Sequence, residues 1–278
     1  MLLATLLSLG AAVLHAVWNF VAKRADEDRF ILLWAQFAAA GAIAGVALAV
    51  HAAVEGMPAS GYGWAAASAA VHLPYVWLLA RAYTVGNFSV SYPIARGGGA
   101  ALAAVGGVVV LSDHLAGWQA IGIAIVLIGL IVLSWTATGP EVAIALLVAV
   151  TIGTYTLVDA HGARSTGSAA YVLATFAVFG ATITVFCLCT GRVEAMRATM
   201  ARAWRRALLT GLASLVTYGM VLIAVQHASV GYVTALRESS VVLAAFAGWR
   251  LLDEGSHRRR IAAAVIVTVG LVTLVSGR

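Results

Sequence analysis

Charged residues are the scarcest class in this sequence: Asp, Glu, Lys and Arg make up only 10% of its 278 residues, whereas 62% are apolar. Ordinary soluble domains carry about 25% charged residues, so the composition excludes a chain that is mainly a soluble globular domain. Apolar stretches of about 20 residues, the length that crosses a bilayer core as a helix, recur along the whole sequence with short gaps. The sequence therefore predicts a polytopic membrane protein.

Cysteines are few, and the motifs of common enzymes are absent. Cys187 and Cys189 fall in one apolar stretch at a spacing that directs them to different helix faces, with no histidine cluster beside them, so we expect no disulfide, metal site or cofactor. A P-loop is absent, which excludes ATP as a direct energy source, and neither GxSxG nor HExxH occurs. We expect a protein that is not an enzyme. An intramembrane enzyme using a serine beside His72 is the alternative from another functional class.

The long apolar stretches predict helices, because a backbone group without a hydrogen bond costs several kcal/mol in lipid and the runs are too uniformly apolar for barrel strands. Gly41 and Gly45 form a GxxxG pair that predicts close helix packing. We expect an all-α membrane protein with ten transmembrane helices, at residues 2–22, 29–50, 62–84, 87–111, 117–135, 141–160, 168–190, 206–226, 229–251 and 260–276.

Basic residues gather on one side of this predicted topology, in the loops that follow alternate spans. Lys23 and Arg24 follow the first span, which also lacks a basic leader, so we expect a retained membrane anchor. Only Arg164 and Arg278 fall on the opposite side. Because positive loops stay in the cytoplasm, both termini are predicted to lie outside it, in a multi-pass protein of the inner membrane. The net charge of +6 is thus explained by topology, and no nucleic-acid partner is expected.

The two halves of the chain resemble each other. A shift of 141 residues pairs Arg96 with Arg237 and Asp113 with Glu254, which predicts a five-helix repeat at residues 1–137 and a second at 138–278, together forming one membrane domain. Five is an odd number, so the second repeat enters the membrane from the opposite side. Inverted repeats of this kind are typical of secondary transporters, whose substrate site lies near the midplane where the repeats meet.

Specific motifs carry a resemblance to a known family. The first span contains the element His15-Ala16-Val17-Trp18-Asn19, and each half ends with a small-residue helix, an acidic residue and a glycine-containing helix. In this sequence the elements are Gly97-Gly98-Gly99, Asp113 and Gly129, and then Ser239-Ser240, Glu254 and Gly270. With ten spans in a 5+5 arrangement, the chain resembles the EamA-type branch of the drug/metabolite transporter superfamily over its full length. It departs from that family where Gly99 and Ser240 replace a frequent proline.

The resemblance implies a function for the chain. It implies export of amino acids, aromatic or other neutral ones, or of related metabolites, by alternating access through a central cavity, and the aromatic amino-acid exporters are the nearest relatives expected. A multidrug or cation exporter of the same superfamily is the alternative. The expected partners are a small-molecule substrate and the lipid bilayer, and the protein is expected to act as a monomer.

Charged residues inside the predicted spans are the first candidates for a substrate site. Arg96 lies in span 4, and Arg237 and Glu238 lie in span 9. A charge at that depth costs at least about 2.5 kcal/mol, so it is expected to have a function. Two readings stay open: Arg96 and Glu238 form a structural ion pair, or a guanidinium binds a substrate carboxylate with two parallel hydrogen bonds.

Histidine and aromatic residues complete the predicted site. His72 and Tyr75 flank Pro74 in span 3, where the proline frees backbone carbonyls, although His72 alternatively makes a hydrogen bond between helices. Trp18 and Tyr155 line the cavity or belong to the interfacial aromatic belt. Tyr83 and Tyr92 flank the turn between spans 3 and 4 and line or gate the pathway. The predicted substrate-binding set is Trp18, His72, Tyr75, Tyr83, Tyr92, Arg96, Tyr155, Arg237 and Glu238.

Overall fold

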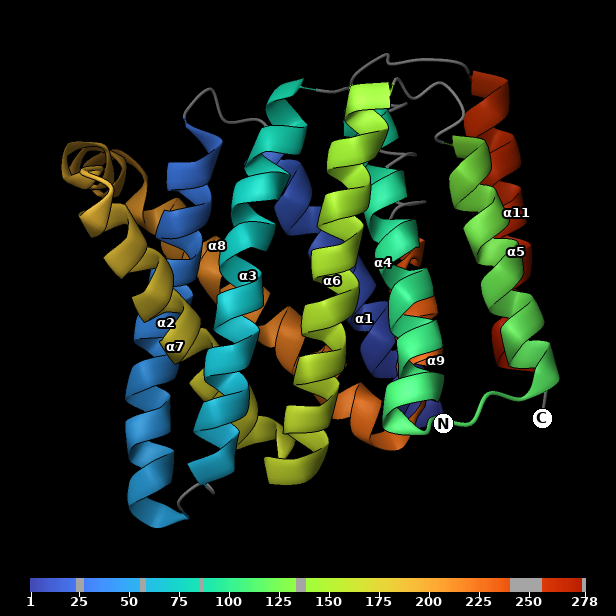
Figure 1. Ribbon diagram of the computed structural model, residues 1–278, viewed down its shortest axis with the longest axis horizontal. Helices are drawn as coiled ribbons and strands as arrows, with labels where there is room; N and C mark the ends of the chain where they lie inside the picture. Colours follow the sequence, from blue (N-terminus) through green and yellow to red (C-terminus); the bar gives the residue numbers. More distant parts are fainter. Residues whose placement is uncertain (24–27, 56–58, 86–87, 134–138, 241–256, 277–278) are drawn as a thin grey trace.

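The computed structural model in Figure 1 describes residues 1–23, 28–55, 59–85, 88–133, 139–240 and 257–276. Throughout these residues the chain forms helices joined by short connections, and they contain no strand. The helices are α1 (Leu2–Lys23), α2 (Arg29–Val54), α3 (Ala59–Val85), α4 (Phe88–Leu111), α5 (Gly117–Leu133), α6 (Gly139–Thr166), α7 (Ser168–Cys189), α8 (Val193–His227), α9 (Val230–Arg237) and α11 (His257–Ser276).

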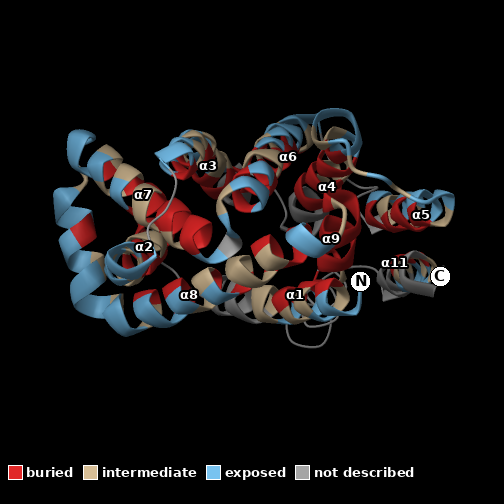
Figure 2. Ribbon diagram, turned by 90° about the horizontal axis from the view of Figure 1, so that it is seen from below, coloured by how far each residue is buried: buried red, intermediate tan, exposed pale blue. Residues whose placement is uncertain are grey.

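Several of these helices have the length and apolar composition that a membrane crossing requires. Five candidate spans lie within the described residues, at Arg29–Val54, Ile94–Leu111, Gly139–Thr166, Ala169–Cys189 and Val193–His227. Shorter apolar segments occupy Leu2–Ala16 in α1 and Gly117–Val132 in α5. Figure 2 shows buried residues on the helix faces that point inward and exposed residues on the outer faces. Many outward side chains are large and aliphatic, as a lipid-facing surface requires.

The helices of the two halves of the chain pack against each other. Helix α3 of the first half contacts α6 and α7 of the second half. Reciprocally, α8 of the second half contacts α1 and α2 of the first half. The pairs α2 with α7 and α5 with α11 lie at opposite edges of the molecule in Figure 1, and α4 contacts α6 as α9 contacts α1. Helix α1 rises from the N-terminus in that view, whereas α6 descends.

Close packing of α2 on α7 depends on Gly41 of α2 and Gly180 of α7. A Cβ added to Gly41 would lie 2.8 Å from the Cα of Gly180 and 2.8 Å from the carbonyl oxygen of Phe176, and both are backbone atoms that cannot turn aside. A Cβ added to Gly45 would meet the Cβ of Ala177 at 3.9 Å, an ordinary contact. The predicted close approach is therefore confirmed at Gly41, and Gly45 leaves room for a methyl group.

This difference predicts unequal effects of two alanine substitutions. Gly41→Ala forces the helices apart and is expected to destabilise the fold by about 1–3 kcal/mol, as overpacking does in well-packed interiors. Gly45→Ala is the matched control and is expected to leave stability near that of the wild type. Thermal denaturation of the two purified variants in detergent measures both, and equal melting temperatures would contradict the packing argument.

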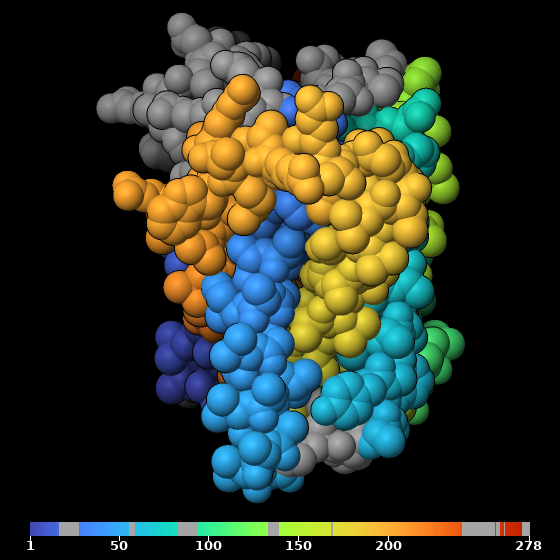
Figure 3. Space-filling view, turned by 90° about the vertical axis from the view of Figure 1, so that its left-hand side faces the viewer, coloured from blue at the N-terminus to red at the C-terminus, as the bar shows by residue number. Residues whose placement is uncertain are grey.

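The structure differs from the sequence prediction at two spans. The span predicted at 206–226 corresponds to the part of α8 that follows a non-helical break at Ala203, but a further helical segment that begins at Val193 precedes it. Figure 3 shows the start of α8 crossing one end of the molecule. Arginine, alanine and methionine favour helices, so this charged segment folds as a helix before the apolar part begins.

The ninth predicted span is the second departure. It was expected to be continuous over 229–251, but α9 ends at Arg237, and the amide of Glu238 donates to the carbonyl oxygen of Ala235 at 3.1 Å. Residues 241–251 of that span lie outside the described residues. The helix is therefore interrupted at Glu238, one of the charged residues that the sequence placed inside the membrane, and residues 239–240 are helical.

Candidate functional site

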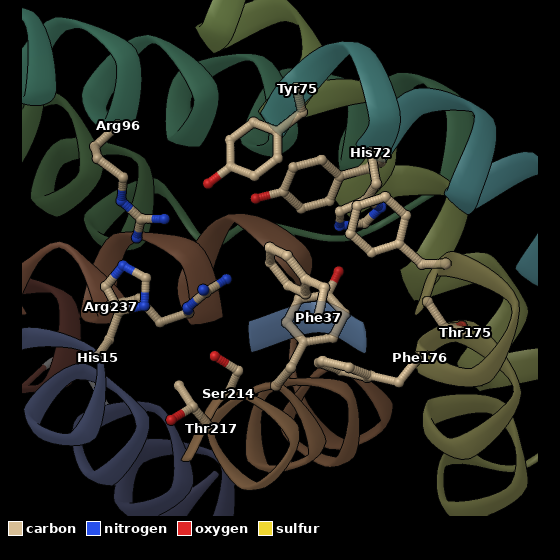
Figure 4. Close-up of a pocket in the computed structure, with 13 residues that line it drawn as sticks. His15, Phe37, His72, Tyr75, Arg96, Thr175, Phe176, Ser214, Thr217 and Arg237 are labelled. Carbon is tan, nitrogen blue, oxygen red and sulfur yellow. The ribbon is translucent and has the colours of Figure 1, made fainter. Parts of the chain in front are cut away.

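A cavity lies in the interior of the helix bundle (Figure 4), and seven of its lining residues are aromatic or histidine side chains of α2, α3, α6, α7 and α8. It contains about 640 Å³ of space free of protein atoms, a volume that includes open solvent. Its lining residues are His15, Phe37, His72, Tyr75, Arg96, Tyr155, Thr175, Phe176, Phe179, Ser214, Thr217, Tyr218 and Arg237.

One end of the cavity is cationic. Figure 4 shows Arg96, Arg237 and His15 gathered there, from α4, α9 and α1. Both arginines are only 6% exposed. The Nη2 of Arg96 donates to Oε1 of Glu238 at 2.7 Å, which confirms the predicted ion pair between these two residues. Glu238 is 1% exposed and stands behind the cavity wall, and it is not among the lining residues.

Arg237 differs from Arg96 in its partners. Within the part of the chain that the structure describes, no hydrogen bond or ion pair holds the Arg237 guanidinium, although Arg96 and Glu238 are close enough to act on it electrostatically. In Figure 4 the guanidinium points into the cavity. A buried cation without a bonded partner is costly, so this group is suited to hold an anion that enters the cavity.

Aromatic rings form the other end. His72 stacks on Tyr155 with ring centroids 4.0 Å apart, and Tyr75 meets Tyr155 edge-on at 5.3 Å. Phe176 contacts Tyr218 edge-on at 6.0 Å, and Figure 4 shows Phe37 on the same side. These rings present a wall of flat apolar faces, which stack well on a planar or aromatic ligand.

His72 is fixed in its own helix. Its Nδ1 lies 3.0 Å from the carbonyl oxygen of Ser68 and 3.1 Å from the Ser68 hydroxyl. In the tautomer that carries the proton on Nδ1, this nitrogen donates to the Ser68 carbonyl oxygen, and in the other tautomer it accepts from the Ser68 hydroxyl. The hydrogen bond expected between helices is instead one within α3.

A second acidic residue, Asp159, is buried behind the aromatic wall. Tyr171 donates to its Oδ1 at 2.9 Å and Tyr218 donates to its Oδ2. The second bond holds the Tyr218 hydroxyl against Asp159, and Tyr218 itself lines the cavity. In the described residues, no group of three or more His, Cys, Asp or Glu side chains is arranged to hold a metal ion.

Hydroxyl groups supply the remaining polar contacts. Gln36 donates to Ser214 Oγ at 2.5 Å. The hydroxyls of Thr175 and Thr217 are buried and have no hydrogen-bond partner in the described part of the chain. Both line the cavity, so they are available to a ligand there.

The structure brings together five of the residues that the sequence selected: His72, Tyr75, Arg96, Tyr155 and Arg237 all line one cavity. Glu238 contacts it only through Arg96. The side chains of Trp18, Tyr83 and Tyr92 lie outside the described residues.

Sequence reasoning missed the contribution of α2, α7 and α8. A signal was present in α8, where Ser214, Thr217 and Tyr218 follow one another at helical spacing in an otherwise apolar run, and so lie on one face. The phenylalanines had no such signal, because Phe37, Phe176 and Phe179 occur among other apolar residues.

Comparison with known proteins gives matches of two kinds. Residues 139–276 match the model of the EamA-like transporter family. A solved structure titled "Crystal structure of protein" is 14% identical, with a TM-score of 0.73 over 98% of this chain and 97% of that chain, and at this identity the likeness shows the fold alone. No curated protein matches. Residues 139–276, the second half of a chain whose long apolar helices are those of a multi-pass membrane protein, thus resemble the EamA-like transporter family.

Proposed function

We propose that the protein is a secondary transporter of the inner membrane, which exports amino acids, aromatic or other neutral ones, or related metabolites by alternating access through the cavity. This proposal rests on one interior cavity that contains both the Arg237 guanidinium, which has no bonded partner in the described residues, and a wall of aromatic rings. Ionisable residues at membrane depth that face a cavity mark a substrate pathway. The transporter family matched by residues 139–276 supports this assignment.

The proposed architecture has ten transmembrane helices in two inverted five-helix repeats, residues 1–137 and 138–278. Reciprocal glycine contacts support it. A Cβ on Gly129 would meet Val267, and a Cβ on Gly270 would meet Val126, which are the same contacts after a shift of 141 residues. Such reciprocity is expected where helices meet across a pseudo-twofold axis. The proposal includes a monomer whose termini both lie outside the cytoplasm.

Substrate binding follows from the two ends of the cavity. The Arg237 guanidinium presents parallel N–H donors that match a carboxylate, and charge-assisted bonds of this kind are about twice as strong as neutral ones. The stacked rings of His72 and Tyr155 then provide a face for an aromatic or apolar side chain. An amino acid has both features.

The alternatives fit the cavity less well. A cationic drug would have to approach two buried arginines, and neither nearby carboxylate is exposed to it. An intramembrane hydrolase would need an accessible nucleophile, but Ser68, the serine bonded to His72, is 0% exposed and lies outside the cavity lining.

Counterflow tests the proposal in proteoliposomes that contain the purified protein. Vesicles loaded with unlabelled tryptophan are expected to accumulate radiolabelled tryptophan, and other aromatic amino acids are expected to compete. Threonine and a cationic dye are run in parallel, with protein-free vesicles as the control. Transport of the dye alone would favour the multidrug alternative, and no counterflow of any of the three would reject the proposed function.

A further inference from the structure

The charged residues that line the cavity narrow the class of substrate that it can bind. We propose that the cavity recognises aromatic carboxylic acids as monoanions and that a free amino group is dispensable for binding. This inference rests on the proposed function. It predicts that amino acids are one subset of the ligands and that acids without an amino group bind at least as well.

The described lining of the cavity contains full positive charges but no carboxylate. Its charged members are Arg96 and Arg237, and Asp and Glu do not occur among the described residues that line it. The positive charge of Arg96 is matched by Glu238 at 2.7 Å. The charge of Arg237 has no bonded counterpart, so a monoanionic ligand would give this guanidinium a bonded partner.

The second carboxylate near the site is also engaged. Asp159 is 0% exposed and accepts hydrogen bonds from Tyr171 and Tyr218 on its two oxygens. Because Tyr218 lines the cavity and Asp159 does not, this carboxylate is not presented to a ligand. A substrate ammonium group therefore meets no acidic partner in the described lining.

The available partners for an ammonium group are weak. Ring faces such as those of Tyr155 and Phe176 attract a cation by about 0.5–2 kcal/mol, and the Thr175 and Thr217 hydroxyls accept ordinary hydrogen bonds. Burial of an ammonium group costs several kcal/mol unless it is paired, and the two arginines repel it. Removal of the amino group therefore removes the cost of burying an unpaired ammonium group, whereas removal of the carboxylate removes the group that would bind Arg237.

The sharpest test uses three probes that share one phenyl ring and one two-carbon arm. Phenylalanine carries both groups, 3-phenylpropionate lacks the amino group and 2-phenylethylamine lacks the carboxylate. Isothermal titration calorimetry on the purified full-length protein measures binding of each. We expect 3-phenylpropionate to bind at least as tightly as phenylalanine and 2-phenylethylamine to bind at least 30-fold more weakly.

Two variants separate site chemistry from general damage. Arg237→Gln is expected to weaken 3-phenylpropionate at least 30-fold and to leave 2-phenylethylamine unchanged or tighter, a change of selectivity that misfolding would not produce. Arg197→Gln, at an exposed position at the start of α8, is the matched control with wild-type affinities. Binding of 2-phenylethylamine as tight as that of 3-phenylpropionate would overturn the inference.

Other outcomes distinguish this inference from the proposed function. If 3-phenylpropionate binds more than tenfold more weakly than phenylalanine, the amino group is required and the inference fails while amino-acid transport stands. If tryptophan shows counterflow and none of the three probes binds, the assigned substrate class is wrong. If counterflow and binding both fail, the proposed function fails with the inference.

Discussion

Arg237→Gln is expected to lower tryptophan counterflow at least about 30-fold while membrane yield stays near that of the wild type. The guanidinium is 6% exposed, lines the cavity and has no bonded partner in the described residues. Removal of one member of a buried, hydrogen-bonded charge pair costs about 2–5 kcal/mol, and the substrate carboxylate is the other member here. Glutamine removes an unpaired buried charge, so the fold itself is not expected to suffer.

Two further variants make this result specific. Arg237→Lys keeps the charge without the two parallel donors and is expected to retain part of the activity. Arg197→Gln is expected to transport normally. Wild-type transport by a well-expressed Arg237→Gln protein would contradict the assignment of Arg237 to the substrate carboxylate.

Arg96→Leu is expected to destabilise the protein by about 3–5 kcal/mol, because it removes the bonded partner of the buried Glu238 carboxylate. The two residues join α4 to α9 through a bond of 2.7 Å, and both are almost fully buried. Glu238→Leu is expected to have an effect of similar size, since it leaves Arg96 without its carboxylate. Thermal denaturation in detergent and yield from membranes measure both.

The double variant Arg96→Leu with Glu238→Leu separates structure from binding. Replacing a buried pair by apolar residues is often neutral, so the double variant is expected to regain most of the stability. Transport is expected to stay low, because Arg96 also lines the cationic end of the cavity. If the double variant regains both stability and transport, Arg96 serves the fold alone.

Much of the architecture could be predicted from the sequence, because membrane crossing is a property of long apolar runs. The predicted internal repeat drew attention to Arg96 and Arg237, and both line the cavity. His72 and Tyr75 were selected as site residues because they are polar side chains inside an apolar span. Charged and polar groups are rare in such spans, and each one is therefore informative.

Other features had no local signal. Phe37 and Phe176 form part of the cavity wall only because α2 and α7 pack closely through glycines, and that packing depends on the tertiary arrangement. The helix at the start of α8 was concealed by its charge, since arginine runs read as loops in a hydropathy pattern. Glu238 was placed with the substrate contacts, yet its bond to Arg96 turns it to a supporting position.

Chemical access to Thr217 tests most directly whether the cavity is the transport pathway. Thr217→Cys is introduced after Cys187 and Cys189, the only two cysteines of the chain, are replaced by alanine. The proposal predicts that a membrane-impermeant thiol reagent modifies the Thr217→Cys thiol from either side of the membrane and that tryptophan slows modification. Val216→Cys lies at a neighbouring position on the exposed outer surface of α8, which faces lipid in the proposed membrane protein. Its thiol is therefore expected to react slowly with the membrane-impermeant reagent, and tryptophan is expected not to change the rate. Absence of modification from both sides, or modification that tryptophan leaves unchanged, would contradict the proposal.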